Sequence, residues 1–351
     1  MKRLSALMLA MTGAYMLFAS CGGDDEPVAA PKPDPVPDPV PEVSTLAKGA
    51  DVGWMTQLES EGHKFYTPSG QQKELLSLLK DDCGVNAIRL RVWVDPADGW
   101  NGVDDVVAKA KRAASLGMRL MIDFHFSDTW ADPGKQYTPK AWEGMSLDET
   151  KQALAAHVTD VLGRLKSEGI TPEWVQIGNE TTQGFIWPLG KDDKPGNFTQ
   201  LFNAGYDASK KVFPEAKVLV HIDRGEDQWR YDHILGILRS NGGKYDMVGM
   251  SFYPESSDYV AKTRTLLSNI DYVFDTYKKP VMVVETGMRY TEGKESGYIM
   301  KSILDAAKSK SDDRLQGVFY WEPEAPAGYN GGYDKGAFVD GKPNEAFDAF
   351  K

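Results

Sequence analysis

The chain has 351 residues, of which 41 % are apolar and 26 % are charged, a composition typical of an ordinary soluble globular protein. Its net charge of −11 argues against a nucleic-acid partner, because phosphate binding requires a basic face. The length suits one large domain or two small ones, and a neutral or weakly charged ligand fits the charge better.

The first residues resemble the export signal of a bacterial lipoprotein. Lys2 and Arg3 precede the apolar run "LSALMLAMTGAYMLF", which is shorter than a typical membrane-spanning helix, and small residues then lead to Cys21. We therefore predict a signal peptide over residues 1–20 and a lipid on Cys21; a plain signal peptide cut elsewhere is the alternative. The following "GGDDE" resembles the export tag of some Gram-negative surface lipoproteins, which implies an outer-membrane lipoprotein that faces the cell surface.

Alternating prolines dominate the next segment, "PVAAPKPDPVPDPVPE". Because proline disrupts helices and donates no backbone hydrogen bond, this segment should be an extended spacer. We assign residues 21–47 to the lipidated cysteine and this Pro/Asp-rich linker, and residues 48–351 to a single folded domain, since no second break in composition follows.

Short apolar runs alternate with longer amphipathic stretches through the rest of the chain. The predicted strands are "GADVGWM", "NAIRLRVWV", "RLMIDFHF", "EWVQIGNE", "KVLVHID", "MVGMSFY", "VMVVETG" and "GVFYWEP". The predicted helices include residues 103–117, 149–169 and 294–310. Near-continuous apolar strands indicate burial on both faces, and eight strand-and-helix repeats favour a (β/α)₈ TIM barrel. A doubly wound sheet would show a glycine-rich phosphate loop after its first strand, and "DVGWMTQLESEG" is not one.

Polar side chains stand where these strands end, which is where a barrel of this type carries its active site. Glu180 ends the fourth strand and Glu285 lies at the end of the seventh, so the two should be nearly opposite each other. Two carboxyl groups that flank one bond are the minimal equipment for glycoside hydrolysis, although an ion pair at the barrel rim is the alternative for each. Asn179 can bind a sugar hydroxyl, and Arg89 and Tyr253 can hold Glu285 ionised.

The same residues give the chain a resemblance to the retaining glycosidases of clan A, and in detail to glycoside hydrolase family 53, the endo-β-1,4-galactanases. The motifs that carry it are "GADVGWMTQLESEG", "IRLRVWVDP", "DFHFSDTWADPGKQ", "VQIGNETTQGFIWP", "DMVGMSFYP", "VMVVETG" and "GVFYWEP". The resemblance implies endo-cleavage of β-1,4-galactosidic bonds in galactan and type I arabinogalactan, with retention by double displacement. Glu180 would be the general acid/base and Glu285 the nucleophile, with carboxyl groups about 5–5.5 Å apart.

The resemblance also implies a set of sugar-binding residues. Around the sugar whose bond is cut it places Asn179, Arg89, His125, His221, Tyr253 and Trp321. Trp321 would be the stacking floor, because galactose presents an apolar C–H face to an aromatic ring. The weaker candidates for neighbouring subsites or walls are Trp93, Asp128, Trp130 and Trp187.

Some positions depart from the family pattern. Phe126 and Phe252 replace tyrosines that are common in the family, and "YPESSDYV" follows strand six where many relatives carry an aromatic residue and a histidine. The segment "MRYTEGKESG" is short where some bacterial relatives hold calcium, so that ion is not carried over. We expect no required cofactor, with structural calcium the alternative left open, and no catalytic metal, since the five histidines form no close-spaced ligand pair.

Two rival functions remain on the sequence alone. A β-1,4-glucanase or mannanase of the same clan would carry the same two glutamates. A surface glycan-binding lipoprotein without activity would keep the cleft, although the presence of both carboxylates argues against it. We expect a monomer whose partners are galactan and galacto-oligosaccharides.

Overall fold

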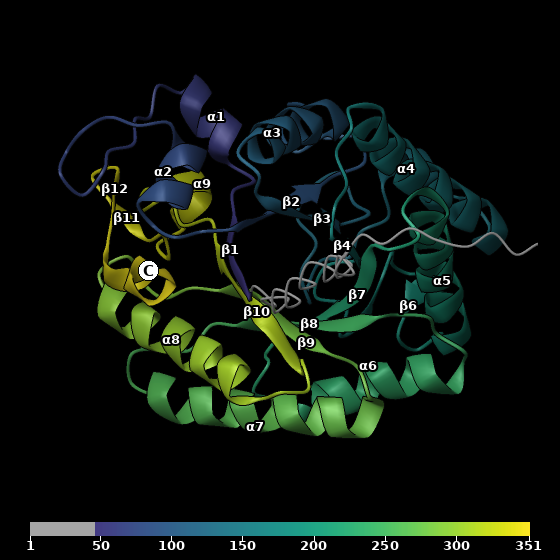
Figure 1. Cartoon of the computed structure of the whole chain (residues 1–351). Helices are drawn as coiled ribbons and strands as arrows, with labels where there is room; N and C mark the ends of the chain where they lie inside the picture. Colours follow the sequence, from purple (N-terminus) through teal and green to yellow (C-terminus); the bar gives the residue numbers. More distant parts are fainter. Residues whose placement is uncertain (1–45) are drawn as a thin grey trace, which may run out of the picture. The chain divides into compact units, whose positions relative to one another are not determined.

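A computed structural model describes residues 46–351, so the predicted signal peptide, Cys21 and nearly all of the linker lie outside the described residues. Within these residues eight parallel strands close into a barrel in the order β1-β10-β9-β8-β7-β4-β3-β2 (Figure 1). The strands are β1 Ala47–Asp51, β2 Ala87–Val92, β3 Arg119–Phe124, β4 Trp174–Ile177, β7 Lys217–Ile222, β8 Met247–Phe252, β9 Val281–Thr286 and β10 Leu315–Trp321. The predicted TIM barrel is confirmed, and a strand is present in each predicted run. The first strand lies earlier than predicted: β1 begins at Ala47, which was assigned to the linker, and ends at Asp51, and Met55 already begins a helix.

Helices surround the strands, as Figure 1 shows for α3 to α8. They are α1 Met55–Ser60, α2 Leu75–Asp81, α3 Val103–Ser115, α4 Leu147–Ser167, α5 Pro195–Val212, α6 Gln228–Ser240, α7 Tyr259–Tyr277, α8 Gly293–Ser309 and the short α9 Tyr329–Gly332, with 3₁₀ turns η1 Lys140–Trp142 and η2 Glu345–Phe350. Two small hairpins pair β5 Gly184–Phe185 with β6 Gly190–Lys191 and β11 Phe338–Val339 with β12 Lys342–Pro343. The predicted helical stretches correspond to α3, α4 and α8. Between residues 46 and 351, no helix combines the length and apolarity that a membrane crossing requires.

Helix α4 shows how local sequence sets an element and its buried face. Ser146 caps the first turn: its side chain accepts from the Glu149 backbone N–H, and the Glu149 carboxylate accepts from the Ser146 backbone N–H. Leu154, Val158 and Leu165 recur at helical spacing, and all three are fully buried. The reciprocal cap satisfies donors that a helix start leaves free, while the apolar stripe attaches the helix to the barrel.

The interior of the barrel is layered. A hydrophobic cluster fills the part nearer the N-terminal ends of the strands with side chains from all eight strands, namely Ala47, Ala87, Met121, Trp174, Leu219, Met247, Met282, Val284 and Phe319. Because side chains alternate along a strand, the next inward position lies two residues further on. On four neighbouring strands that position carries Arg89, Asp123, Gln176 and His221, all without exposed surface. Inside the barrel a polar layer therefore packs on the hydrophobic cluster, on the side of the C-terminal ends of the strands.

The barrel closes between its first and last strands, where Ala47 pairs with Gly317. Gly317 has a φ of 144°, and a Cβ placed there would lie 2.2 Å from the carbonyl oxygen of Ala47. Gly49 likewise leaves room for its neighbour, since a Cβ placed there would lie 2.1 Å from the Phe319 ring. Glycine at both positions allows the seam to close with Phe319 inside it.

Candidate active site

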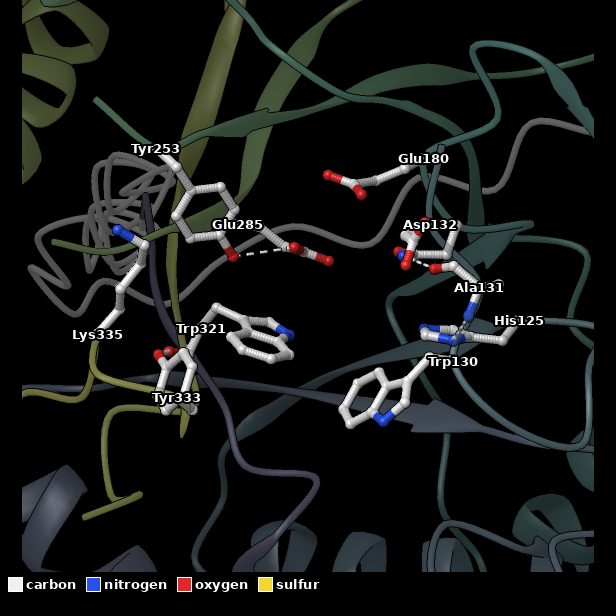
Figure 2. A pocket seen from close by; sticks show the side chains of 11 residues that line it. His125, Trp130, Ala131, Asp132, Glu180, Tyr253, Glu285, Trp321, Tyr333 and Lys335 are labelled. Atoms are coloured by element: carbon white, nitrogen blue, oxygen red, sulfur yellow. Dashed lines mark hydrogen bonds between the residues drawn. The ribbon is translucent and has the colours of Figure 1, made fainter. Parts of the chain in front are cut away.

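A cavity of about 440 Å³ opens where the barrel strands end. Its lining residues are His125, Trp130, Ala131, Asp132, Asn179, Glu180, Tyr253, Glu285, Trp321, Tyr333 and Lys335. Figure 2 shows the side chains of Glu180 and Glu285 pointing into the same open space. The structure thus brings the two predicted glutamates to one site, together with five of the ten side chains expected around a sugar, namely His125, Trp130, Asn179, Tyr253 and Trp321.

The backbone at the end of β4 presents Glu180. Glu180 has a φ of 48°, in the left-handed region that costs a residue with a side chain about 1–2 kcal/mol. Its N–H donates to Nδ1 of His221 at 3.3 Å, and the next N–H, from Thr181, donates to the His221 carbonyl at 2.8 Å. On the other side Gln136 donates from Nε2 to the carbonyl of Asn179 at 2.7 Å. These contacts hold the strained turn that directs Glu180 into the cavity.

Glu285 is held differently, by two donors. Arg89 donates from Nη1 to Oε1 of Glu285 at 2.8 Å, and the Tyr253 hydroxyl donates to Oε2 at 3.0 Å. These are the two contacts expected from the sequence. Both stabilise a negative charge on this carboxyl group and fix its orientation.

Arg89 is the centre of the polar layer below the cavity. Besides Glu285, its guanidinium donates to Asp51 at 2.6 Å, Asp123 at 2.8 Å and Asn179 at 3.0 Å. Gln176 accepts two further bonds from Nε and Nη2, at 3.2 and 3.0 Å. Burial opposes the guanidinium charge, but Asp123, Glu285 and Asp51 together raise the pKa of Arg89 above its usual value. Arg89 is therefore a fixed positive charge beneath Glu285.

The two glutamates differ in the electrostatics of their surroundings. Burial, followed by the charge of Glu285, raises the pKa of Glu180 well above its usual value, and no cation in residues 46–351 lies in ion-pair contact with it. Burial also raises the pKa of Glu285, but Arg89 and the Tyr253 hydroxyl oppose this. The proton shared by such a pair consequently belongs on Glu180, and the negative charge on Glu285.

Two histidines stand beside this pair in different places. His125 lines the cavity; its Nε2 donates to Asp123 at 2.9 Å, because its Nδ1 accepts from Trp93 Nε1 at 3.3 Å. His221 lies beneath the lining: its Nδ1, which accepts from the Glu180 N–H, also lies 3.0 Å from Gln176 Nε2, and its Nε2 lies 2.8 Å from Ser251 Oγ. Burial, then the charge of Arg89, lowers the pKa of His221 well below its usual value, so this ring is neutral.

Trp321 forms an aromatic wall of the cavity and is held at its edges. Its ring meets Trp54 at 5.3 Å, Trp130 at 5.9 Å and Tyr333 at 5.0 Å between centroids, each close to edge-on. The Tyr333 hydroxyl also donates to the Trp321 carbonyl at 2.7 Å. This packing fixes the plane of the Trp321 ring before any ligand binds.

Several residues expected around the sugar lie outside the cavity lining. Arg89 and His221 have no exposed surface, so Arg89 acts on the site through Glu285 and Asn179, and His221 through the backbone N–H of Glu180. The other three expected sugar-binding residues that do not line the cavity are Trp93, Asp128 and Trp187. Trp93 is buried against His125, and the Asp128 carboxylate accepts from the N–H groups of Asp95 and Lys140, which shapes the loop after β3.

The remaining differences concern residues without a predicted role. Ala131, Asp132, Tyr333 and Lys335 line the cavity. Ala131 and Asp132 fall inside the motif "DFHFSDTWADPGKQ", whereas Tyr333 and Lys335 follow β10 in a segment with no signal of its own. Phe126 and Phe252, the two expected departures from the family pattern, are both buried away from the lining.

Comparison with known proteins agrees with this geometry. The sequence profile described as "Glycosyl hydrolase family 53" matches residues 47–349. The chain belongs to glycosyl hydrolase family 53. Among family relatives, it is 34 % identical over 306 residues to the endo-beta-1,4-galactanase of Bacillus subtilis, covering 79 % of this chain and 69 % of that protein. It is 33 % identical over 301 residues to the arabinogalactan endo-beta-1,4-galactanase of Thermothelomyces thermophilus, covering 79 % and 89 %.

Two solved structures share the fold over most of the chain. A structure from work on two fungal beta-1,4-galactanases superposes with a TM-score of 0.79 at 29 % identity, covering 86 % of this chain and 98 % of that one. The catalytic domain of the family from Ignisphaera aggregans also gives a TM-score of 0.79, at 27 % identity, covering 90 % and 98 %. Family membership and barrel fold are thus established along nearly all of the described chain.

Proposed function

We propose that this protein is an endo-β-1,4-galactanase that acts on galactan and arabinogalactan with retention of configuration. One observation carries the proposal: Glu180 and Glu285 face one cavity in a family 53 barrel, in surroundings that assign the proton to the first and the charge to the second. The relatives named above are galactanases. A glucanase or mannanase of the same clan would use the same pair, and the family match favours galactan.

In the first step Glu285 attacks the anomeric carbon of the sugar stacked on Trp321. The bond from that carbon to the leaving oxygen breaks, and the oxygen takes its electron pair together with the proton of Glu180. The product is a galactosyl ester of Glu285 and a shortened chain. Arg89 and Tyr253 stabilise Glu285 as a carboxylate before the attack and as a leaving group afterwards.

In the second step Glu180, now ionised, removes a proton from water as the water oxygen attacks the same carbon. The ester bond breaks and its electron pair returns to Glu285. Two carboxyl groups supply both steps, so we propose a reaction that requires no cofactor. In residues 46–351 no group of three His, Cys, Asp or Glu side chains is arranged to hold a metal.

The deciding experiment is incubation of purified protein with linear galactan. New reducing ends, a rapid fall in chain length and initial products of β configuration by proton NMR are expected. Parallel incubations with glucan and mannan test the rival activities. Cleavage of either in preference to galactan, or binding without any cleavage, would reject the proposal.

We also propose that the protein is a surface-facing outer-membrane lipoprotein and a monomer. Support for the anchor comes from Cys21 and the apolar run that precedes it, together with the acidic residues that follow. Cys21→Ala should move the protein from the membrane fraction to the soluble fraction, because the acyl chains are lost. Continued membrane association of this variant would refute lipidation at Cys21.

A further inference from the structure

A tryptophan outside the catalytic cavity stands on the same end of the barrel. Trp229 is the second residue of α6, which begins directly after the loop that follows β7. Helices of a (β/α)₈ barrel begin at the end that carries the active site, so Trp229 belongs to that face. Its side chain is 64 % exposed, the highest value among the large hydrophobic side chains of residues 46–351.

The ring of Trp229 is fixed in place although it is exposed. His233, one turn further along α6, stacks against it with centroids 5.1 Å apart and planes 6° from parallel. Nε2 of His233 in turn lies 2.9 Å from Oδ2 of Asp192, which follows β6 in the segment that joins β4 to α5. One face of the indole therefore rests on a tethered imidazole, while the ring keeps a large surface toward solvent.

Polar contacts connect this position to the acid/base. Arg230, the next residue, pairs with Asp223 at 2.9 Å, and Asp223 accepts a hydrogen bond from the Thr182 hydroxyl. Thr182 is two residues beyond Glu180 in the loop after β4. The segment after β4 carries Glu180, Thr182 and Asp192, and the loop after β7 carries Asp223 and leads to Trp229. The segments that hold Trp229 in place are thus the ones that support Glu180.

The proposed reaction indicates which part of the substrate lies over these loops. Glu180 gives its proton to the leaving oxygen, so the leaving part of the chain lies on its side of the cavity. An enzyme that cuts within a polymer has sugar units extending beyond the cavity on that side. A fixed, exposed indole offers such a unit a flat apolar surface, which matches the C–H face of galactose.

We propose that Trp229 is an outlying subsite that stacks a galactosyl unit of the leaving part of a long galactan chain, beyond the catalytic cavity. The inference rests on the proposed function. It adds a binding position that increases the affinity for long chains relative to short ones. A second tryptophan, Trp187, belongs to the segment between β4 and α5 and also lies outside the cavity lining. Its Nε1 donates to the Gln183 carbonyl at 2.8 Å, which holds the ring in place.

The test compares KM on long galactan with KM on the shortest galacto-oligosaccharide that the wild-type protein cleaves. Trp229→Ala should raise the ratio of long-chain to short-chain KM about fivefold, which corresponds to about 1 kcal/mol of binding. Trp229→Phe should restore most of the difference, because it keeps an aromatic surface. Tyr298→Ala is the matched control: Tyr298 is 40 % exposed on α8 and its ring meets Tyr259 edge-on, so the ratio should not change.

Two further measurements separate the outcomes. On galactan affinity gels Glu285→Ala should be retarded more than the Glu285→Ala/Trp229→Ala double variant. An unchanged KM ratio in Trp229→Ala would overturn the subsite, as would sedimentation data showing a wild-type dimer that Trp229→Ala abolishes, since a second copy would then cover the ring. Failure of the proposed function gives a different result, namely no cleavage of galactan by the wild-type protein.

Discussion

At the residue scale, the two glutamates share a cavity but have different neighbours. Arg89 and Tyr253 contact Glu285, whereas Glu180 lies at a strained turn with no cation of the described chain in ion-pair contact. Burial alone would raise both pKa values; the two donors separate them. That separation allows one carboxyl group to donate a proton while the other attacks.

Replacement of the acid/base tests its role directly. Glu180→Gln should lower kcat/KM on galactan by about 100- to 10,000-fold, because the leaving oxygen loses its proton donor. An aryl galactoside with an acidic leaving group needs no such donor, so the first step on this substrate should be largely spared and added azide should accelerate turnover. Glu285→Ala should remove activity on both substrates. Equal loss on both by Glu180→Gln would contradict the assignment.

The hydroxyl of Tyr253 sets the acid side of the pH profile. Its hydrogen bond lowers the pKa of Glu285 relative to burial alone, and the reaction requires Glu285 ionised. In Tyr253→Phe that pKa rises, so the acid limb of kcat/KM should move to higher pH and activity below the optimum should fall about tenfold. The Tyr333 hydroxyl contacts the Trp321 carbonyl instead, so the acid limb of Tyr333→Phe should stay in place.

At the element scale, helix α4 depends on its first turn. Ser146→Ala removes the capping box, which should lower the free energy of unfolding by about 1 kcal/mol in urea titrations. Ser167, the last residue of the same helix, donates to the Arg164 carbonyl at an exposed position. Ser167→Ala should therefore change stability much less, and an equal loss in both variants would argue against a specific role of the cap.

The helices and strands were also the features that the sequence predicted best. Apolar runs such as "VMVVETG" have one interpretation in an alternating chain of this length, a strand buried on both faces, and each run became a barrel strand. The apolar periodicity of helix α4 predicted the helix. The position of the loops after β10 could not be predicted, because a segment without periodicity or turn signals is positioned by its contacts with the rest of the fold.

At the scale of the whole molecule, the barrel depends on the contact between its first and last strands. Gly317→Ala would place a methyl group against the Ala47 carbonyl at a φ that residues with side chains avoid, and should cost about 3 kcal/mol or more. A Cβ added to Gly163 in α4 would meet no atom within 4 Å beyond its chain neighbours and the helix's own backbone, so Gly163→Ala should instead stabilise the protein by about 0.5–1 kcal/mol. Thermal and urea unfolding would distinguish them.

The sequence by itself determined the strands, their polar ends and the pairing of Glu180 with Glu285, because strand burial and the position of a barrel's active site follow from local pattern and topology. It also indicated that Arg89 and Tyr253 would support Glu285. Only the tertiary structure decided that Arg89 and His221 lie beneath the cavity and that Tyr333 and Lys335 line it. Those positions depend on which side chains meet across the closed barrel, and contacts between residues far apart in the chain leave no local signal in the sequence.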